Sequence, residues 1–181
     1  MKRLFLIGGL TAAFLLVVLA ASAQNKANFA GAWGLDKAKS QGLSPRMQGA
    51  DKVTWTITQD DKTVSIDTKV EGGQPPAGGG GGGGGMGGGG GRGPAAPAAY
   101  NLDGSETTTE NGQAKSTLKA SWEGSALNLS RKTVFNGPNG EVTSSESRKL
   151  SLSGDGKVLT AVVHNESPRG TTDSTLVFNK Q

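Results

Sequence analysis

The sequence predicts an all-β fold, an antiparallel up-and-down meander of about eight to ten short strands that forms a barrel or a sandwich. Three observations lead to this class. Apolar and polar residues alternate with a period of two, clusters of glycine, asparagine and aspartate separate the alternating segments, and no segment has a convincing helical repeat. The length of 181 residues suits one domain.

Residues 1–23 have the pattern of a secretory signal peptide. Lys2 and Arg3 precede an apolar stretch, and Ala21-Ser22-Ala23 matches a small-residue cleavage site. We expect cleavage before Gln24, no stable membrane insertion afterwards, and a periplasmic or secreted location; an uncleaved anchor is the alternative. Because the chain has no cysteine, disulfides, thiolate metal sites and a lipid anchor at this terminus are excluded.

The charge balance argues against nucleic acid as a partner. The leader holds Lys2 and Arg3, so its removal lowers the 19 basic residues to 17 against 15 acidic ones. A chain so close to neutral, without a basic cluster interleaved with aromatic residues, lacks the pattern of a nucleic-acid-binding surface.

The first strands are predicted within residues 24–71, the N-terminal part of the domain. Residues 53–58 and 64–70 alternate apolar and polar side chains around a turn at Asp60-Asp61-Lys62, which predicts a hairpin with one face in solvent. One short helical turn is expected before it, within residues 36–47, with Ser44 as cap. The inward residues of the hairpin are Val53, Trp55, Ile57, Val64, Ile66 and Val70.

Residues 72–97 are a low-complexity insertion rich in glycine and proline. Two unbroken glycine runs, 78–85 and 87–91, have no side chains to bury and a large entropy cost of ordering. We predict a disordered loop inserted into the domain. A phosphate-binding loop is not expected, because no Lys-Ser or Lys-Thr ends the run and no helical pattern comes after it.

Residues 98–181 continue the same pattern and form the C-terminal part of the same domain. The Asp-Gly pair at 155–156 favours a type I′ hairpin turn. The predicted strands include residues 118–122, 127–135, 141–152, 158–163 and 175–178. The turns between them fall at residues 123–124, 136–140 and 154–156.

A motif directly after the leader carries a family resemblance. Phe29, Gly31, Trp33, Leu35, Asp36, Lys39 and Ser40 match F-x-G-x-W-x-L-[ND]-x-x-K-S. The chain resembles lipocalin-like proteins, and more narrowly small exported bacterial β-barrel proteins that are mostly of unassigned function. This resemblance implies a lipocalin-like, calycin-type barrel.

In the barrel that the resemblance implies, Trp33 packs at the closed end. A basic side chain from a late strand lies across it, and Arg148 and Lys180 are the candidates. The chain lacks the Arg-x-Tyr pair with which fatty-acid-binding relatives hold a carboxylate, so fatty-acid binding is not expected from the resemblance.

No catalytic, metal or cofactor site is predicted, and we expect a protein that is not an enzyme. His164 is the single histidine, and Ser167 is the nearest hydroxyl in sequence, but a loop comes next and we interpret His164 as solvated. One histidine without cysteine leaves little to bind zinc. The aspartates at 60, 61, 103 and 155 fit turns, and the glutamates at 106, 110, 141 and 146 fit solvated strand faces.

The barrel interior is the predicted place for function. Trp55 and Trp122 share a strand phase with apolar neighbours, so both should point inward. The first hypothesis is an exported, non-enzymatic module that binds a small apolar ligand; the alternative is a structural or envelope-interaction protein with a filled barrel. The sequence does not indicate an oligomeric state. The predicted ligand-lining residues are Trp33, Trp55, Ile57, Ile66, Leu118 and Trp122.

Overall fold

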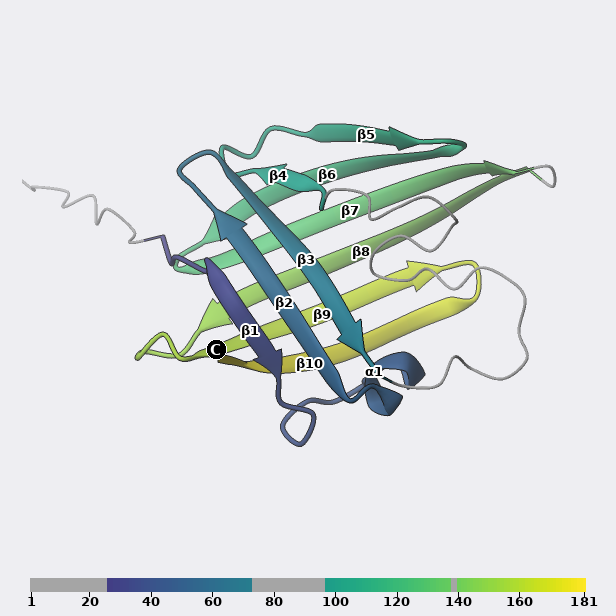
Figure 1. Cartoon of the computed structure of the whole chain (residues 1–181). Helices are drawn as coiled ribbons and strands as arrows, with labels where there is room; N and C mark the ends of the chain where they lie inside the picture. Colours follow the sequence, from purple (N-terminus) through teal and green to yellow (C-terminus); the bar gives the residue numbers. More distant parts are fainter. Residues whose placement is uncertain (1–25, 73–96, 138–139) are drawn as a thin grey trace, which may run out of the picture.

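The computed structural model describes residues 26–72, 97–137 and 140–181. Within these ranges the chain forms one antiparallel sheet of ten strands and one short helix (Figure 1). The predicted leader and nearly all of the low-complexity insertion lie outside the described residues, so both stay predictions. The elements are β1 (Gly31–Leu35), α1 (Pro45–Gly49), β2 (Lys52–Gln59), β3 (Thr63–Glu71), β4 (Ala99–Asn101), β5 (Thr107–Asn111), β6 (Ala114–Glu123), β7 (Ala126–Gly137), β8 (Gly140–Leu152), β9 (Val158–Ser167) and β10 (Gly170–Lys180).

The strand order confirms the predicted meander and favours the barrel over the sandwich. The order is β4-β3-β2-β1-β10-β9-β8-β7-β6-β5, so only the pairing of β1 with β10 joins strands that are distant in sequence. Hydrogen bonding is continuous through that pair, which makes one sheet rather than the two of a sandwich. The sheet curls until β4 packs against β5 and β6, and the barrel is nearly closed.

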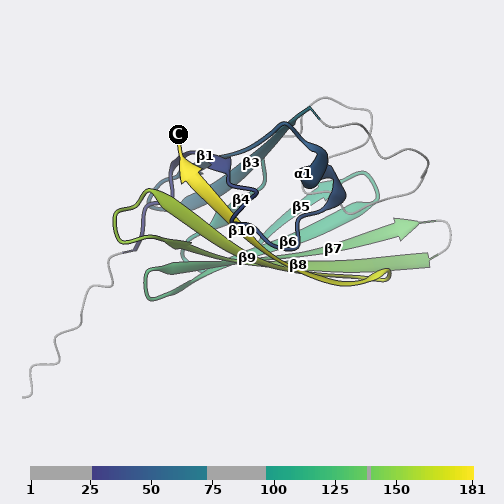
Figure 2. The same ribbon diagram turned by 90° about the horizontal axis from the view of Figure 1, so that it is seen from below.

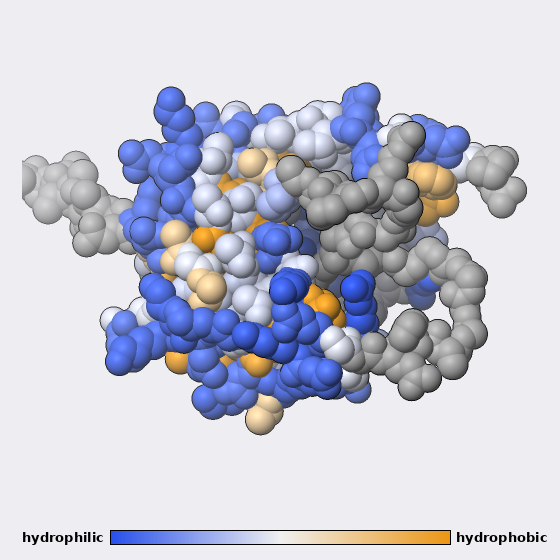
Figure 3. All heavy atoms as spheres, viewed as in Figure 1, coloured by the Kyte–Doolittle hydropathy of each residue, from blue (hydrophilic) through white to orange (hydrophobic). Residues whose placement is uncertain are grey.

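The barrel has a covered half and an open half. The shorter strands β1, β2 and β3 cross over the long strands β7 to β10, whose far ends continue beyond them (Figures 1 and 2). On the face seen in Figure 3 hydrophilic residues predominate, and an apolar patch lies at the far ends of β7 and β8. The side chains beneath β1 to β3 are mostly buried, whereas Phe135 and Val142 at the far ends of β7 and β8 are exposed.

Aromatic packing fills the covered half. Trp33 has no exposed surface, as the resemblance implied, and its Nε1 donates a hydrogen bond to the Phe29 carbonyl oxygen at 2.9 Å. Trp55 stacks on Phe178 with ring centroids 4.3 Å apart. Lys180 is the basic partner of Trp33, with Nζ 5.4 Å from the ring centroid. Each such fully buried apolar side chain contributes roughly 1.5–3 kcal/mol relative to exposure.

Two local predictions have different outcomes. The helical turn is confirmed: α1 begins at Pro45, and the Ser44 hydroxyl accepts a hydrogen bond from the Met47 amide at 3.4 Å. The type I′ turn is wrong. That turn needs positive φ at both central residues, but no described non-glycine residue has positive φ, which excludes it for Asp155. The Gly156 amide instead donates to the Ser153 carbonyl at 2.8 Å, and only Gly156 is left-handed, with φ of 68°.

Candidate functional site

The inner face of β6 to β9 changes character along the strands. Inward side chains that are paired across neighbouring strands form rows. The rows at the covered end are apolar, the next rows contain charged and hydroxyl-bearing residues, and the row at the far end is apolar again. In this order the rows are Trp122, Leu127, Leu150 and Ala161; Ala120, Leu129, Arg148 and Val163; Leu118, Arg131, Glu146 and Asn165; Ser116, Thr133 and Ser144; and Ala114, Phe135 and Val142.

An ion pair lies in the charged rows. Arg148 and Glu146 share the inward face of β8, and their side chains approach to 2.6 Å with only 9% and 15% of their surface exposed. The Arg148 guanidinium also lies 5.5 Å from the ring centroid of Trp55. The prediction that Glu146 is solvated is therefore wrong. Serine, glutamate and arginine occupy the inward positions in the middle of β8, so hydrophobic alternation gave no signal for that stretch.

Arg131 is the second inward arginine. It sits directly opposite Glu146 in the β7–β8 register, yet it forms no ion pair with a described residue. Its Nη2 donates to the Ser116 hydroxyl at 3.4 Å, while the buried Nε atoms of Arg131 and Arg148 have no hydrogen-bond partner among the described residues. Such unpaired buried donors are uncommon in proteins.

Tyr100 of β4 belongs to the same neighbourhood. Burial raises the pKa of its hydroxyl, while the charges of Arg148 and Arg131 lower that pKa and the charge of Glu146 raises it. The two arginines, the glutamate and the tyrosine are thus close enough to interact. Sequence reasoning missed the cluster as a whole, because it joins β4, β7 and β8; only Arg131 follows the inward phase of Leu127 and Leu129 in the sequence.

The six predicted lining residues are brought together, but mostly as packed core. All of them lie in or against one hydrophobic cluster. Trp33, Trp55 and Leu118 have no exposed surface, and Ile57 keeps 2%, whereas Ile66 and Trp122 are half-buried. Their role in ligand binding stays a prediction.

Two hollows of about 550 and 300 Å³ are lined mainly by outward-phase residues of β6 to β9, although the larger also includes Arg131 and Glu146. Both volumes reach the range of ligand pockets. Charged and hydroxyl side chains dominate the lining of the larger one, which does not suit an apolar ligand. Its residues are Glu106, Thr117, Lys119, Ser130, Arg131, Lys132, Ser145, Glu146, Ser147, His164 and Glu166.

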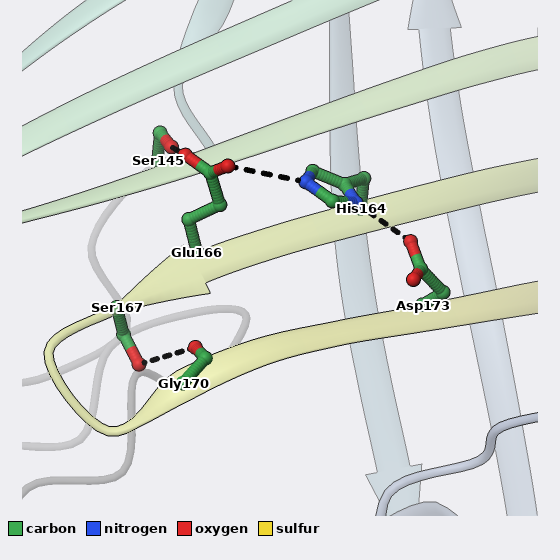
Figure 4. Close-up of polar contacts among 6 residues, drawn as sticks. All are labelled: Ser145, His164, Glu166, Ser167, Gly170 and Asp173. Carbon is green, nitrogen blue, oxygen red and sulfur yellow. Dashed lines mark hydrogen bonds and ion pairs between the residues drawn. The ribbon is translucent and has the colours of Figure 1, made fainter.

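His164 lies on this outer face between two carboxylates (Figure 4). Its Nδ1 is 2.6 Å from Asp173 and its Nε2 is 3.4 Å from Glu166, and these hydrogen bonds raise the pKa of the imidazole. The Ser145 hydroxyl donates to Glu166, and the Ser167 hydroxyl donates to the Gly170 carbonyl oxygen. Neither hydroxyl meets the imidazole, so the contacts do not form a nucleophile–base pair.

Asp173 was missed from sequence, although it lies directly opposite His164 in the β9–β10 register. Pairing the two strands around the Pro168-Arg169-Gly170 turn would have found it. Among the described residues, no group of three or more His, Cys, Asp or Glu can hold a metal ion. Helices of this part of the chain are all too short or too polar to cross a membrane.

The fold and the inner face define a class: an antiparallel barrel, nearly closed, with an aromatic core at one end and an arginine-bearing face at the other. No family model and no curated protein matches the chain. Solved structures with a similar shape include the zebrafish ileal bile acid-binding protein complexed with cholic acid, at 16% identity and a TM-score of 0.45, covering 84% of this chain and 98% of that one.

Two further structures are secretory abundant heat soluble proteins from Ramazzottius varieornatus. One is 13% identical with a TM-score of 0.47, and the other, protein 4, is 11% identical with a TM-score of 0.46. Each covers 84% of this chain and 94% of its own length. At these identities and TM-scores the likenesses assign no function to this chain.

Proposed function

We propose that the protein is an exported, non-enzymatic binding protein that takes up a small, largely apolar ligand at the open end of its barrel. One observation carries the proposal. Phe135 and Val142 lie directly opposite each other on β7 and β8 and share the inward phase, yet 43% and 45% of their surface is exposed. A ligand that covered this pair would remove apolar surface from water at about 25 cal/mol per Å².

The packed core limits where such a ligand fits. Trp33, Trp55 and Leu118 are fully buried, so they form the floor beneath the open half rather than its lining. Ile66 on β3 keeps part of its surface and is the predicted lining residue best able to contact a ligand. The proposed site is therefore the far inner face of β7 and β8, reached from the open end of the barrel.

Export is part of the proposal and rests on residues 1–23. N-terminal sequencing of the protein recovered from the extracytoplasmic fraction is expected to begin at Gln24. A full-length chain retained in the membrane would contradict cleavage and favour the anchor.

Titration with the neutral fluorescent probe N-phenyl-1-naphthylamine tests ligand binding. Phe135→Ser and Val142→Ser should each weaken probe binding several-fold, since each removes about 1 kcal/mol or more of apolar burial. Val162→Ser is the matched control, because Val162 is 51% exposed on the outer face of β9 and should leave the affinity unchanged. No saturable binding to the wild type, or equal losses in all three variants, would overturn the proposal.

A filled barrel with a structural or envelope role is the second candidate, favoured by the complete burial of Trp33, Trp55 and Leu118. It predicts no probe binding. It also predicts that a variant in which a ten-residue Gly-Ser linker replaces residues 73–96 stays folded but leaves the envelope fraction. Probe binding together with unchanged fractionation of that variant would exclude it.

A further inference from the structure

We infer that the ligand of this barrel carries one negative charge, such as a carboxylate or sulfonate, and that Arg131 binds it. The inference rests on the proposed function and adds to it the chemical class of the ligand, an anionic amphiphile.

The inner face carries an unbalanced positive charge. Along β6 to β9 the inward positions include three charged residues: Arg131, Glu146 and Arg148. Glu146 is held by Arg148 at 2.6 Å, and these two charges cancel. Arg131 is left as a half-buried positive charge without an ion-pair partner among the described residues. Burying a charge without a partner is costly, so a bound anion would be favoured there.

This chain has no carboxylate side chain left for Arg131. All 15 aspartates and glutamates fall within residues 36–173, and every one of them is in the described part. Residues 1–25, 73–96 and 138–139 contain neither aspartate nor glutamate. The neutralising anion for Arg131 must therefore come from outside the chain's side chains.

Several hydrogen-bond donors surround Arg131. The buried Nε atoms of Arg131 and Arg148 both lack partners among the described residues. The two arginines are diagonal neighbours on β7 and β8, which brings them within about 7–8 Å. The Ser116 and Thr133 hydroxyls, 2.9 Å apart, occupy the next row. Charge-assisted bonds from such groups are stronger than neutral ones.

One small molecule can contact both the Arg131 charge and the apolar pair Phe135 and Val142. Phe135 comes four residues after Arg131 on the same face of β7, a separation of about 13 Å. A molecule with its charged group at Arg131 can thus lay an apolar ring system or chain of that length toward Phe135 and Val142. This order of polar and apolar groups suits an amphiphile rather than a hydrocarbon.

Two dyes with the same ring system provide the test. 8-Anilinonaphthalene-1-sulfonate carries a sulfonate, and N-phenyl-1-naphthylamine lacks it. We expect the wild type to bind the sulfonate at least about tenfold more tightly, which is the effect of a charge-assisted hydrogen bond. Arg131→Gln should abolish that preference and leave the neutral dye's affinity unchanged. Lys132→Gln is the control, with the same charge change on the outer face of the same strand.

The outcomes separate the inference from the proposed function. If neither dye binds, the proposed function fails. If both dyes bind equally to the wild type, the function stands and the anion inference fails. If Arg131→Gln and Lys132→Gln weaken binding of the sulfonate dye equally, the preference comes from the overall positive charge of the protein. That result would also overturn the anion inference. The wild-type ratio of the two affinities decides even if Arg131→Gln does not fold, and near-ultraviolet circular dichroism checks each variant's packing.

Discussion

Trp33 and Trp55 are both fully buried, but their indole N–H groups differ in hydrogen bonding. The Trp33 Nε1 donates to the Phe29 carbonyl oxygen at 2.9 Å, whereas the Trp55 Nε1 has no hydrogen-bond partner among the described residues. Replacing Trp33 by phenylalanine would leave a buried carbonyl unpaired, and the same change at Trp55 would remove an unpaired donor. We expect Trp33→Phe to lower the free energy of unfolding by about 1 kcal/mol more than Trp55→Phe.

Urea unfolding of both variants measures this difference. The two substitutions remove the same atoms, so the transfer and cavity contributions are similar and the hydrogen bond dominates the comparison. Equal losses would show that the Trp33 hydrogen bond contributes nothing net to stability.

His164 gives a prediction about pH. Hydrogen bonds to Asp173 and then Glu166 raise its pKa above the ordinary value of 6.5. A raised pKa in the folded state means that protonated His164 stabilises the fold below about pH 6.5, and that this contribution is lost as the pH rises through the folded-state pKa. The stability advantage of the wild type over His164→Gln should therefore shrink as the pH rises from below about 6.5 through the folded-state pKa.

The imidazole resonance of this single histidine reports its pKa directly by NMR. Asp173→Asn should lower the pKa more than Glu166→Gln, because the Asp173 contact is 2.6 Å and the Glu166 contact 3.4 Å. A larger effect from Glu166→Gln would contradict the geometry of Figure 4.

At the scale of elements, the sequence predicted those strands in which apolar and polar residues alternate. The β2–β3 hairpin has an alternation of apolar and polar residues, and the observed strands match residues 53–58 and 64–70. Along the middle of β8 the inward residues Ser144, Glu146 and Arg148 are as polar as the outward ones, so alternation there could not indicate which face is buried. The charged cluster could therefore not be predicted from the sequence, because its formation depends on the register between strands.

The β8–β9 turn gives a matched pair of glycines. Gly154 and Gly156 both have open space where a Cβ would go, but only Gly156 is left-handed, with φ of 68°. Alanine at Gly156 should cost about 1–2 kcal/mol, the penalty of a left-handed L-residue, whereas alanine at Gly154 should be near neutral. Thermal unfolding compares the two, and a Gly156→Ala variant as stable as the wild type would refute the assigned backbone.

At the scale of the whole molecule, one long-range pairing holds the meander together. The last strand β10 returns to the first strand β1, with Trp33 opposite Lys180, and the Gln181 amide donates to the Ala32 carbonyl oxygen. All other neighbours in the sheet are also neighbours in sequence. The low-complexity insertion joins β3 to β4 at one edge of the sheet, three strands from β10, so barrel closure should not depend on its length.

Replacing residues 73–96 with a ten-residue Gly-Ser linker tests this view. Ser65 pairs with Ala99, and β3 runs six residues further to Glu71, so the linker must span about 20 Å. Ten residues reach about 33–36 Å, and the change in loop-closure entropy amounts to less than about 1 kcal/mol. The free energy of unfolding should therefore rise slightly or stay constant, while Leu118→Ala, at a fully buried position, should lower it by about 2–5 kcal/mol. If the linker variant loses as much unfolding free energy as Leu118→Ala, the insertion packs against the barrel and is part of the fold. If the variant keeps both its stability and its affinity for the two dyes, the open end of β7 and β8 binds the dyes without the insertion.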